Sequence, residues 1–192
     1  MNTDADELTV KRRKTARVVC IVAAVLVLLP CLGFNWMRAP RGADAGISLV
    51  FTSSGDESES NLNVVDMYNQ YRSESDQILG TFAYAGIATL FFSVIAAGAL
   101  AAAGGLAFKD KFIRTPIPLT TVALLALCLS LVSGCVFLGA IPKDIMSGGV
   151  GWPFFLYGAG VVTGLAGAQM LGKAYSEVRD PYWDGLDQTP GA

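Results

Sequence analysis

Histidine is absent from the 192 residues, and charged residues make up only 16% of the chain. Without histidine there is no imidazole to ligate haem or a metal ion, and the most common general base of enzymes is missing. Soluble domains carry about 25% charged residues, so this composition falls outside that class. A net charge of −2 without a basic stripe also gives no reason to expect a nucleic-acid partner. We therefore expect no catalytic site, no cofactor and no metal site.

Cysteine is missing from the long polar stretch of the chain. The four cysteines lie in apolar segments, at Cys20, Cys31, Cys128 and Cys135. A disulfide framework would need cysteines in the polar region, so we expect free, buried thiols that pack as small hydrophobic side chains. A Cys31–Cys135 bridge is the alternative, because both residues are predicted near the outer ends of their helices.

Charge is missing altogether from four apolar runs, at residues 18–37, 77–108, 115–142 and 145–172. Each run reaches the roughly 20 residues that a helix needs to cross a bilayer. The sequence therefore predicts an all-α integral membrane protein with four transmembrane helices in a bundle. Ion-coupled transporters and proton relays need charges inside their spans, so their absence argues against secondary transport by a monomer.

Most of the 14 lysines and arginines fall on one side of the predicted spans. The positive-inside rule places that side in the cytoplasm, together with both termini. The start of the chain also resembles a secretory signal peptide, but its apolar run is longer than the roughly 7–15 residues of such a signal. The predicted segments are a cytoplasmic start (1–17), spans at 18–37, 77–108, 117–141 and 152–172, an acidic extracytoplasmic loop (38–76), a basic cytoplasmic loop (109–116), a short outer loop (142–151) and a cytoplasmic tail (173–192).

The acidic loop is predicted to form a small extracytoplasmic cap. Residues 47–52 are rich in β-formers and favour one short strand. A helical pattern starts at Asn63 and runs into the second span without an intervening proline or glycine before Gly80. Trp36 is expected to mark the outer end of the first span at the membrane interface, and Trp152 the outer start of the last span.

Small residues recur at every fourth position in three of the four predicted spans. This spacing keeps them on one helix face, where a second helix can approach to backbone contact. We expect the second, third and fourth spans to form a tight bundle, and the first span, with bulkier residues, to face lipid or pack by interdigitation. The predicted packing residues are Gly160, Gly164, Ala168, Gly172, Ala97, Ala101, Gly105, Ala126, Ser130 and Gly134.

Two polar groups outside the spans are candidates for partner contacts. Asp56, Glu57 and Glu59 lie in a turn rich in serine and glycine, and their spacing is not that of a calcium-binding loop. We interpret them mainly as solvating a turn. Tyr182 and Trp183 lie among acidic residues in the tail, where they either dock a cytoplasmic partner or rest on the membrane interface.

In layout the chain resembles the claudin and peripheral-myelin-protein class of four-span proteins. The shared features are cytoplasmic ends, a long first outer loop with a strand, a helix leading into the second span, and a tryptophan closing the first span. The loop lacks the Gly-Leu-Trp motif and the cysteine pair of that class, so the resemblance is one of layout. It implies adhesion or sensing through the first outer loop.

The sequence favours a non-enzymatic accessory or scaffolding subunit of a larger membrane complex. The expected partners are the lipid bilayer and other membrane protein subunits or copies of the chain itself, in a plasma or inner membrane. The alternatives are the claudin-like adhesion or sensor protein and, third, an oligomeric channel or small transporter. The first choice follows from abundant helix-contact surface combined with the lack of chemical signatures.

Overall fold

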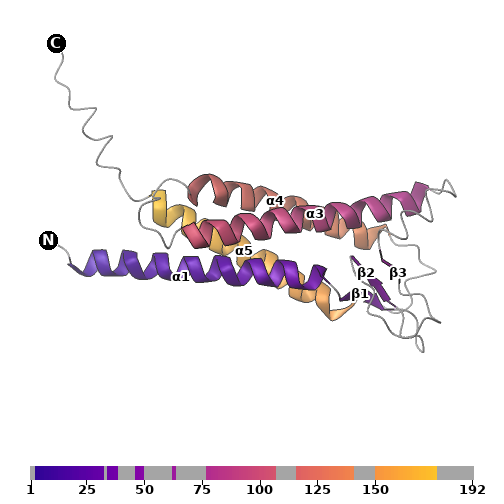
Figure 1. The fold of residues 1–192 in the computed structure, drawn as a ribbon, viewed down its shortest axis with the longest axis horizontal. Helices are drawn as coiled ribbons and strands as arrows, with labels where there is room; N and C mark the ends of the chain where they lie inside the picture. Colours follow the sequence, from indigo (N-terminus) through magenta and orange to yellow (C-terminus); the bar gives the residue numbers. More distant parts are fainter. Residues whose placement is uncertain are drawn as a thin grey trace, which may run out of the picture.

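Four long helices and three short strands make up the described part of this computed structural model (Figure 1). It describes residues 3–32, 34–38, 46–49, 62–63, 77–106, 116–140 and 150–176. The helices are α1 (Thr3–Leu28), α3 (Gln77–Leu106), α4 (Pro116–Gly139) and α5 (Trp152–Ser176). A 3-10 turn, η1 (Leu29–Cys31), follows α1.

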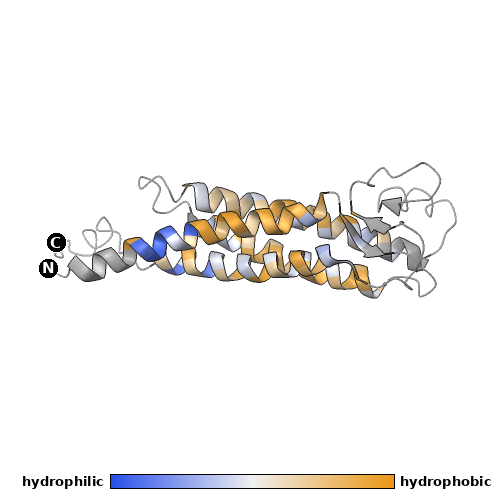
Figure 2. Ribbon diagram, turned by 90° about the horizontal axis from the view of Figure 1, so that it is seen from below, coloured by the Kyte–Doolittle hydropathy of each residue, from blue (hydrophilic) through white to orange (hydrophobic). Residues whose placement is uncertain are grey.

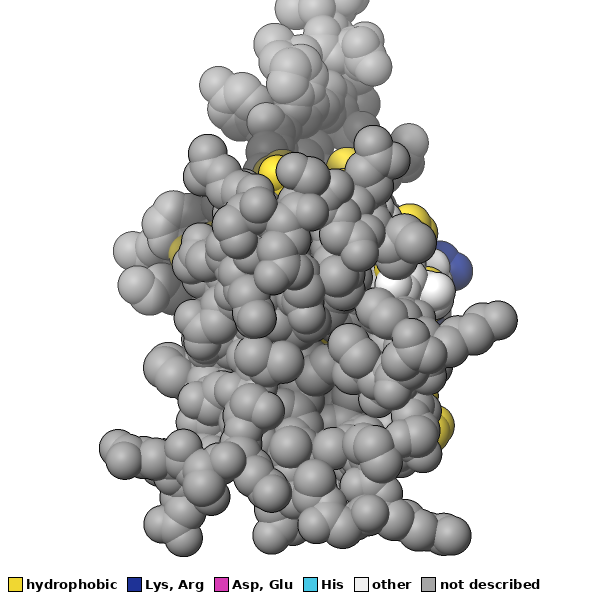
Figure 3. All heavy atoms as spheres, turned by 90° about the vertical axis from the view of Figure 1, so that its right-hand side faces the viewer, with side chains coloured by type: hydrophobic (Ala, Val, Ile, Leu, Met, Phe, Trp, Pro, Cys, Tyr) yellow, Lys and Arg dark blue, Asp and Glu magenta, His cyan; other side chains and the backbone are white. Residues whose placement is uncertain are grey.

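Each of the four helices contains a segment long and apolar enough to cross a membrane. The segments are Val10–Cys31, Ala83–Leu106, Pro118–Gly139 and Trp152–Ala174. Large apolar side chains are exposed on the outside of the bundle as well as buried in its core. Hydrophobic residues run along the helices (Figure 2), and several hydrophobic side chains are visible among those described at the sheet end (Figure 3). Helices that are apolar all round are typical of membrane spans. The four long apolar helices predicted from the sequence are confirmed, and they support the membrane class.

The four helices form a closed bundle in which each helix has two main neighbours. Helix α1 packs against α3 and α5, and α4 packs against the same two helices. Successive helices alternate in direction (Figure 1). The start of α1 and the end of α5 therefore lie at one end of the bundle, and the strands lie at the other (Figure 1).

The first helix ends earlier than the sequence predicted. Helix α1 stops at Leu28, and Pro30 lies in the 3-10 turn that follows, whereas the predicted span continued to residue 37. Proline has no N–H to donate and its ring clashes with the preceding turn, so it ends the helix here. At its other end α1 begins at Thr3, so most of the predicted cytoplasmic start is helical and continuous with the span.

A three-stranded sheet lies at the end of the bundle opposite the start of α1 (Figure 1). Strand β1 (Asn35–Arg38) pairs antiparallel with β2 (Gly46–Ser48), which pairs in parallel with β3 (Leu62–Asn63). The strand predicted at residues 47–52 overlaps β2. The predicted helix from Asn63 into the second span falls largely on residues 64–76, which lie outside the described residues.

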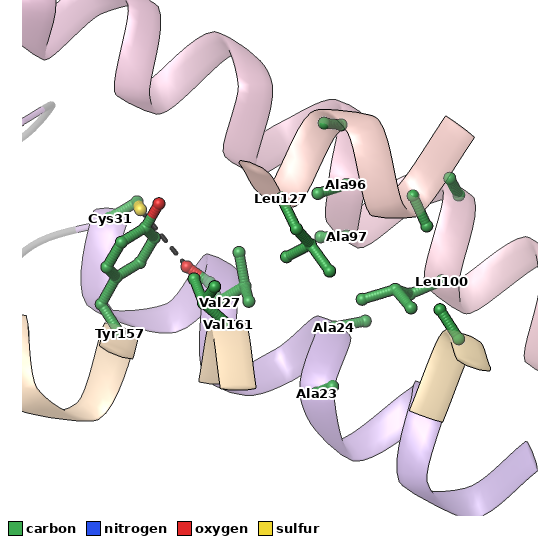
Figure 4. Packing of buried hydrophobic residues seen from close by; sticks show 14 of the residues in the cluster. Ala23, Ala24, Val27, Cys31, Ala96, Ala97, Leu100, Leu127, Tyr157 and Val161 are labelled. Atoms are coloured by element: carbon green, nitrogen blue, oxygen red, sulfur yellow. Dashed lines mark hydrogen bonds between the residues drawn. The ribbon is translucent and has the colours of Figure 1, made fainter. Parts of the chain in front are cut away.

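Small side chains on one helix meet large ones on the next throughout the core. Figure 4 shows Leu100 of α3 and Leu127 of α4 in the middle of the bundle, close to Ala24 of α1 and Ala97 of α3. All four are buried. Without a hydrophobic driving force between spans in lipid, such close van der Waals contact is a main source of helix association.

The interface with the closest backbone approach joins α5 to α1, the helix that the sequence predicted to face lipid or interdigitate by bulky residues. A Cβ atom on Gly160 would lie 2.7 Å from the backbone carbonyl carbon of Leu26, and one on Gly167 would lie 3.2 Å from the backbone nitrogen of Cys20. These glycines are seven residues apart and so share one face of α5. The prediction for the first span was wrong, because Gly160 and Gly167 of α5, together with Gly104 of α3, supply the space that lets α1 approach.

The predicted packing residues divide between the inside and the outside of the bundle. Gly164 faces Leu127 and Leu100 rather than α1, since each four-residue step turns the stripe by about 40° around the helix. The buried members are Gly160, Gly164, Ala168, Ala97, Ala126, Ser130 and Gly134, Gly172 is half-buried, and Ala101 and Gly105 are exposed on the outer face of α3.

Candidate functional site

Hydroxyl groups from three helices meet inside the bundle near its sheet end. This hydroxyl cluster consists of Thr89 and Ser93 on α3, Ser130 and Ser133 on α4, and Tyr157 on α5. All except Ser133 are completely buried. A buried polar group without a hydrogen bond costs free energy, and more so in a bilayer, so the cluster must satisfy its own donors and acceptors.

Three hydroxyls of the cluster donate hydrogen bonds to backbone carbonyls of their own helix. Thr89 Oγ1 donates to the Ala85 carbonyl at 2.7 Å, and Ser93 Oγ donates to the Thr89 carbonyl at 2.6 Å. On α4, Ser133 Oγ donates to the Leu129 carbonyl at 2.8 Å. Serine and threonine in apolar helices commonly bond the carbonyl four residues earlier, which satisfies the hydroxyl proton locally.

Further hydrogen bonds then join the three helices. Ser93 Oγ lies 2.7 Å from Ser130 Oγ, and Ser130 is bonded to the Tyr157 hydroxyl. Thr89 Oγ1 also lies 3.1 Å from Ser133 Oγ, where its proton can be donated in place of the bond to the Ala85 carbonyl. A hydroxyl has only one proton to give. The Ser93 proton is donated to the Thr89 carbonyl, so the proton in the bond between Ser93 and Ser130 must come from Ser130. Tyr157 is then the donor to Ser130, so the chain runs from the phenol on α5 to a backbone carbonyl on α3.

Trp36, in strand β1, packs against Tyr157 of the hydroxyl cluster and so connects the sheet to the bundle. Its side chain is completely buried, and its ring centroid lies 4.9 Å from that of Tyr157 and 5.8 Å from that of Phe154. The indole Nε1 donates to the Pro30 carbonyl at 2.8 Å, and the Trp36 carbonyl accepts from the Gly151 N–H at 2.7 Å. Tryptophan N–H groups usually find such a partner when buried.

The local backbone explains why Trp36 enters the bundle. In the pairing of β1 with β2, Asn35 is opposite Ser48 and Met37 is opposite Ile47, so Trp36 is the extra residue of a β-bulge. A bulge leaves one residue unpaired and redirects its side chain. The same residue therefore closes the sheet end of the core instead of extending the edge of the strand.

The expected position of Trp36 at the membrane interface was therefore wrong. The exposed tryptophan at this end is Trp152, at the start of α5, which contacts Phe34 edge-on with ring centroids 5.1 Å apart. The sequence held a signal that Trp36 is not part of the first helix, because Pro30 ends that helix and polar Asn35 precedes Trp36 in an extended segment.

All four cysteines of the chain are free, as predicted, and no Cys31–Cys135 bridge forms. The prediction that all are buried was wrong, because Cys128 and Cys135 lie on the exposed side of α4. Cys31 is buried and its thiol donates to the Val27 carbonyl at 3.3 Å (Figure 4). Cys135 is exposed on α4. The two thiols therefore belong to different environments, one in the core and one on the outer surface.

The hydroxyl cluster was not predicted as a unit, although Ser130 was predicted as a packing residue. The sequence indicates the cluster only through the spacing of hydroxyl residues in apolar runs. Thr89 and Ser93 are four residues apart, and Ser130 and Ser133 are three residues apart. Such spacing places each pair on one helix face, but it does not identify the opposing helix. The candidate contact residues Asp56, Glu57, Glu59, Tyr182 and Trp183 lie outside the described residues.

Removing the Ser130 hydroxyl, in the middle of the hydrogen-bond chain, should lower stability more than removing the Tyr157 hydroxyl at its end. We expect Ser130→Ala to destabilise the protein by about 1–3 kcal/mol, because the buried Tyr157 phenol loses its Ser130 partner. Tyr157→Phe removes one interhelical bond, worth about 0.6 kcal/mol in a membrane protein. The measurement is unfolding of the single and double variants in detergent.

The double variant tests whether these two residues act together. If they do, adding Tyr157→Phe to Ser130→Ala restores stability or leaves it unchanged, since no phenol is left without its partner. Thr163→Val is the control: its hydroxyl bonds to the Ala159 carbonyl of its own helix at 2.7 Å, and its loss should change stability by no more than about 0.5 kcal/mol. Additive effects of the two substitutions would contradict the chain of bonds described above.

The site is an uncharged hydrogen-bond network that joins three helices. Its groups are hydroxyls, an indole and backbone carbonyls, none of which carries a charge at neutral pH. Among the residues that the structure describes, no group of three or more histidine, cysteine, aspartate or glutamate side chains is placed to hold a metal ion. In comparisons with known proteins, no family model matches the chain, and neither the curated proteins nor the solved structures contain a match.

Proposed function

We propose that this chain is a non-enzymatic accessory or scaffolding subunit of a larger membrane complex. The buried hydroxyls of its core bond to one another and to backbone carbonyls. The apolar stretches 18–31, 83–106, 118–139 and 152–172 contain no charged residue. The interior is thereby occupied by contacts that hold the bundle together, and what remains for other molecules is its outer surface.

The observation that carries this proposal is the outer face of α3, formed by Gly98, Ala101 and Gly105. Ala101 is exposed, and a Cβ atom on Gly98 or Gly105 would meet no atom within 4 Å. By contrast, the outer face of α4 carries large side chains such as Leu125 and Val132. A second helix can therefore approach α3 to backbone contact at this face, which is the geometry that stabilises helix pairs in lipid.

A bulky residue on the outer face of α3 should detach the partner without unfolding the chain. We expect Ala101→Phe to reduce the fraction of chain recovered with other subunits at least tenfold, which corresponds to about 1.4 kcal/mol of binding free energy. Val132→Phe on the exposed face of α4 is the matched control and should leave recovery unchanged. Native mass spectrometry of the protein extracted mildly from its own membrane measures both.

The same experiment distinguishes the proposals. Recovery with other subunits in constant stoichiometry supports the accessory function, and its loss in Ala101→Phe alone identifies the docking face. Equal recovery of both variants would show that the partner binds elsewhere. A homo-oligomer free of other proteins would contradict the accessory function.

We further propose that both ends of the chain are cytoplasmic and that the sheet faces the other side of a plasma or inner membrane. Supporting this orientation, Lys11, Arg12 and Lys14 lie at the bundle end where α1 starts, and Lys173 lies in the last turn of α5 at the same end. Basic residues next to spans favour the cytoplasmic side.

A second candidate is an adhesion or sensor protein that works through residues 38–76. It is favoured by the sheet at one end of the bundle, which is anchored through the buried Trp36. This candidate is distinguished by deletion of residues 53–61, which should abolish its function while leaving assembly intact.

The third candidate, an oligomeric channel, gains less support, because Thr89, Ser93 and Ser130 point into the bundle rather than toward an oligomer axis.

A further inference from the structure

The end of the bundle opposite the sheet carries a concentration of cations on α1. Lys11, Arg12, Arg13, Lys14 and Arg17 follow one another just before the apolar part of this helix, where Figure 2 shows its hydrophilic segment. Because α1 is continuous from residue 3 to residue 28, these cations keep a fixed height relative to the span. Lys11, Arg12 and Lys14 are exposed, Arg13 is half-buried and Arg17 is buried.

The register of α1 against α3 places the exposed cations just beyond the apolar part of the bundle. A Cβ atom on Gly104, close to the end of α3, would lie 3.1 Å from the backbone oxygen of Arg17. Helix α3 is described as far as Leu106. Continuing this antiparallel register, Lys11 and Lys14 lie past the described end of α3. A bilayer crossed by the uncharged stretch 18–31 of α1 would place its headgroups near this height.

The register of α1 against α5 adds a cation from a second helix. Gly160 lies against Leu26 and Gly167 lies against Val19 and Cys20. Continued along the two antiparallel helices, this register brings Lys173 level with Arg13. Lys173 is exposed, as is Lys14, so neighbouring helices present positive charge at one height.

We propose that this basic end, formed by Lys11, Arg12 and Lys14 of α1 with Lys173 of α5, binds the headgroups of anionic phospholipids. Each lysine or arginine near an anionic membrane surface strengthens binding about fivefold. The arginine guanidinium also matches a phosphate with two parallel hydrogen bonds. The acidic residues Asp4, Asp6 and Glu7 lie on the preceding turns of α1, farther from the apolar segment, so the cations are nearer the headgroups.

The test measures lipid retained by the full-length protein in native mass spectrometry from a mild detergent. Phosphatidylglycerol and phosphatidylcholine with the same acyl chains are added in turn. We expect the wild-type protein to retain phosphatidylglycerol in preference, and the triple variant K11Q/R12Q/K14Q to retain it more than tenfold less. Equal retention of the two lipids by the wild-type protein, or unchanged retention by the triple variant, would overturn the proposal.

A matched control removes three cations from residues 38–76 instead, which the sequence predicts on the other side of the membrane. The variant R38Q/R41Q/R72Q loses the same charge, and we expect its retention of phosphatidylglycerol to stay within about threefold of wild type, less than one fivefold cation step. A loss equal to that of the α1 variant would show that the total charge, not the α1 and α5 cations, governs binding.

A salt titration of the wild-type protein provides a test that needs no variant. Raising the ionic strength from about 0.1 M to 1 M shortens the Debye length from about 10 Å to 3 Å. Retention of phosphatidylglycerol should fall toward that of phosphatidylcholine over this range. Salt-independent retention would overturn the proposal even if the triple variant inserted into the membrane in the wrong orientation.

Discussion

Gly160→Leu should prevent α1 and α5 from packing, whereas Gly158→Leu, two residues earlier on the same helix, should be tolerated. Even the first atom of a side chain at Gly160 would lie 2.7 Å from the carbonyl carbon of Leu26 and 2.9 Å from its carbonyl oxygen. These are backbone atoms, so no rotamer change can remove them. The two helices would have to separate along their interface, which we expect to cost about 3 kcal/mol or more.

The neighbouring glycines make this prediction a graded series. At Gly164 the nearest atoms are the Cδ1 atoms of Leu127 at 2.9 Å and Leu100 at 3.2 Å, which are flexible ends of side chains. Gly158 has no atom within 4 Å of the added carbon. Thermal unfolding in detergent should therefore rank leucine at position 160 as most damaging, at 164 as intermediate, and at 158 as within about 0.5 kcal/mol of wild type. Equal stability at 158 and 160 would rule out the α1–α5 interface.

This interface shows what a sequence can and cannot reveal about helix partners. The four spans follow directly from uncharged apolar runs, because a bilayer admits little else. The small residues of α5 also reveal that another helix approaches closely. They do not identify which helix, since the buried face of α1 carries no glycine of its own and much of the space comes from Gly160 and Gly167.

The sheet end was predicted less well, for a local reason. Tryptophan is enriched at membrane interfaces, and that tendency assigned Trp36 to the end of the first span. Pro30 ends the helix first, and the β-bulge then directs Trp36 inward. The same tendency also predicted Trp152 at the start of the last span, and Trp152 is the exposed tryptophan of this end.

The hydroxyl cluster illustrates a third limit. Its members are visible in the sequence as polar residues in apolar runs, and Ser130 was even counted among the packing residues. Their pairing depends on the height of α3, α4 and α5 relative to one another, which connects Ser93 to Ser130 and Ser130 to Tyr157. Relative height is set by the packing of all the helices, so a single-helix pattern does not contain it.

Trp36→Ala should be among the most damaging substitutions at the sheet end. The side chain is completely buried, and its ring contacts those of Tyr157, Phe154 and Phe137, the last with centroids 6.2 Å apart. Truncating a buried tryptophan to alanine costs about 3–5 kcal/mol. The loss also removes the hydrogen bond from Nε1 to the Pro30 carbonyl, which lies just after α1. We expect a large drop in the thermal unfolding temperature in detergent.

Two further variants separate the contributions of Trp36. Trp36→Phe keeps an aromatic ring in the core but removes the indole donor, so its cost should be smaller, about 1–3 kcal/mol for the Pro30 carbonyl left without its donor. Trp152→Ala removes a tryptophan that is half exposed at the same end and should cost less than either. If Trp152→Ala proved as damaging as Trp36→Ala, the sheet would not be anchored through the bulge. The ranking predicted here follows from Trp36 joining the sheet, the end of α1 and the aromatic rings of α4 and α5 in one contact, whereas Trp152 lies on the outside of that junction.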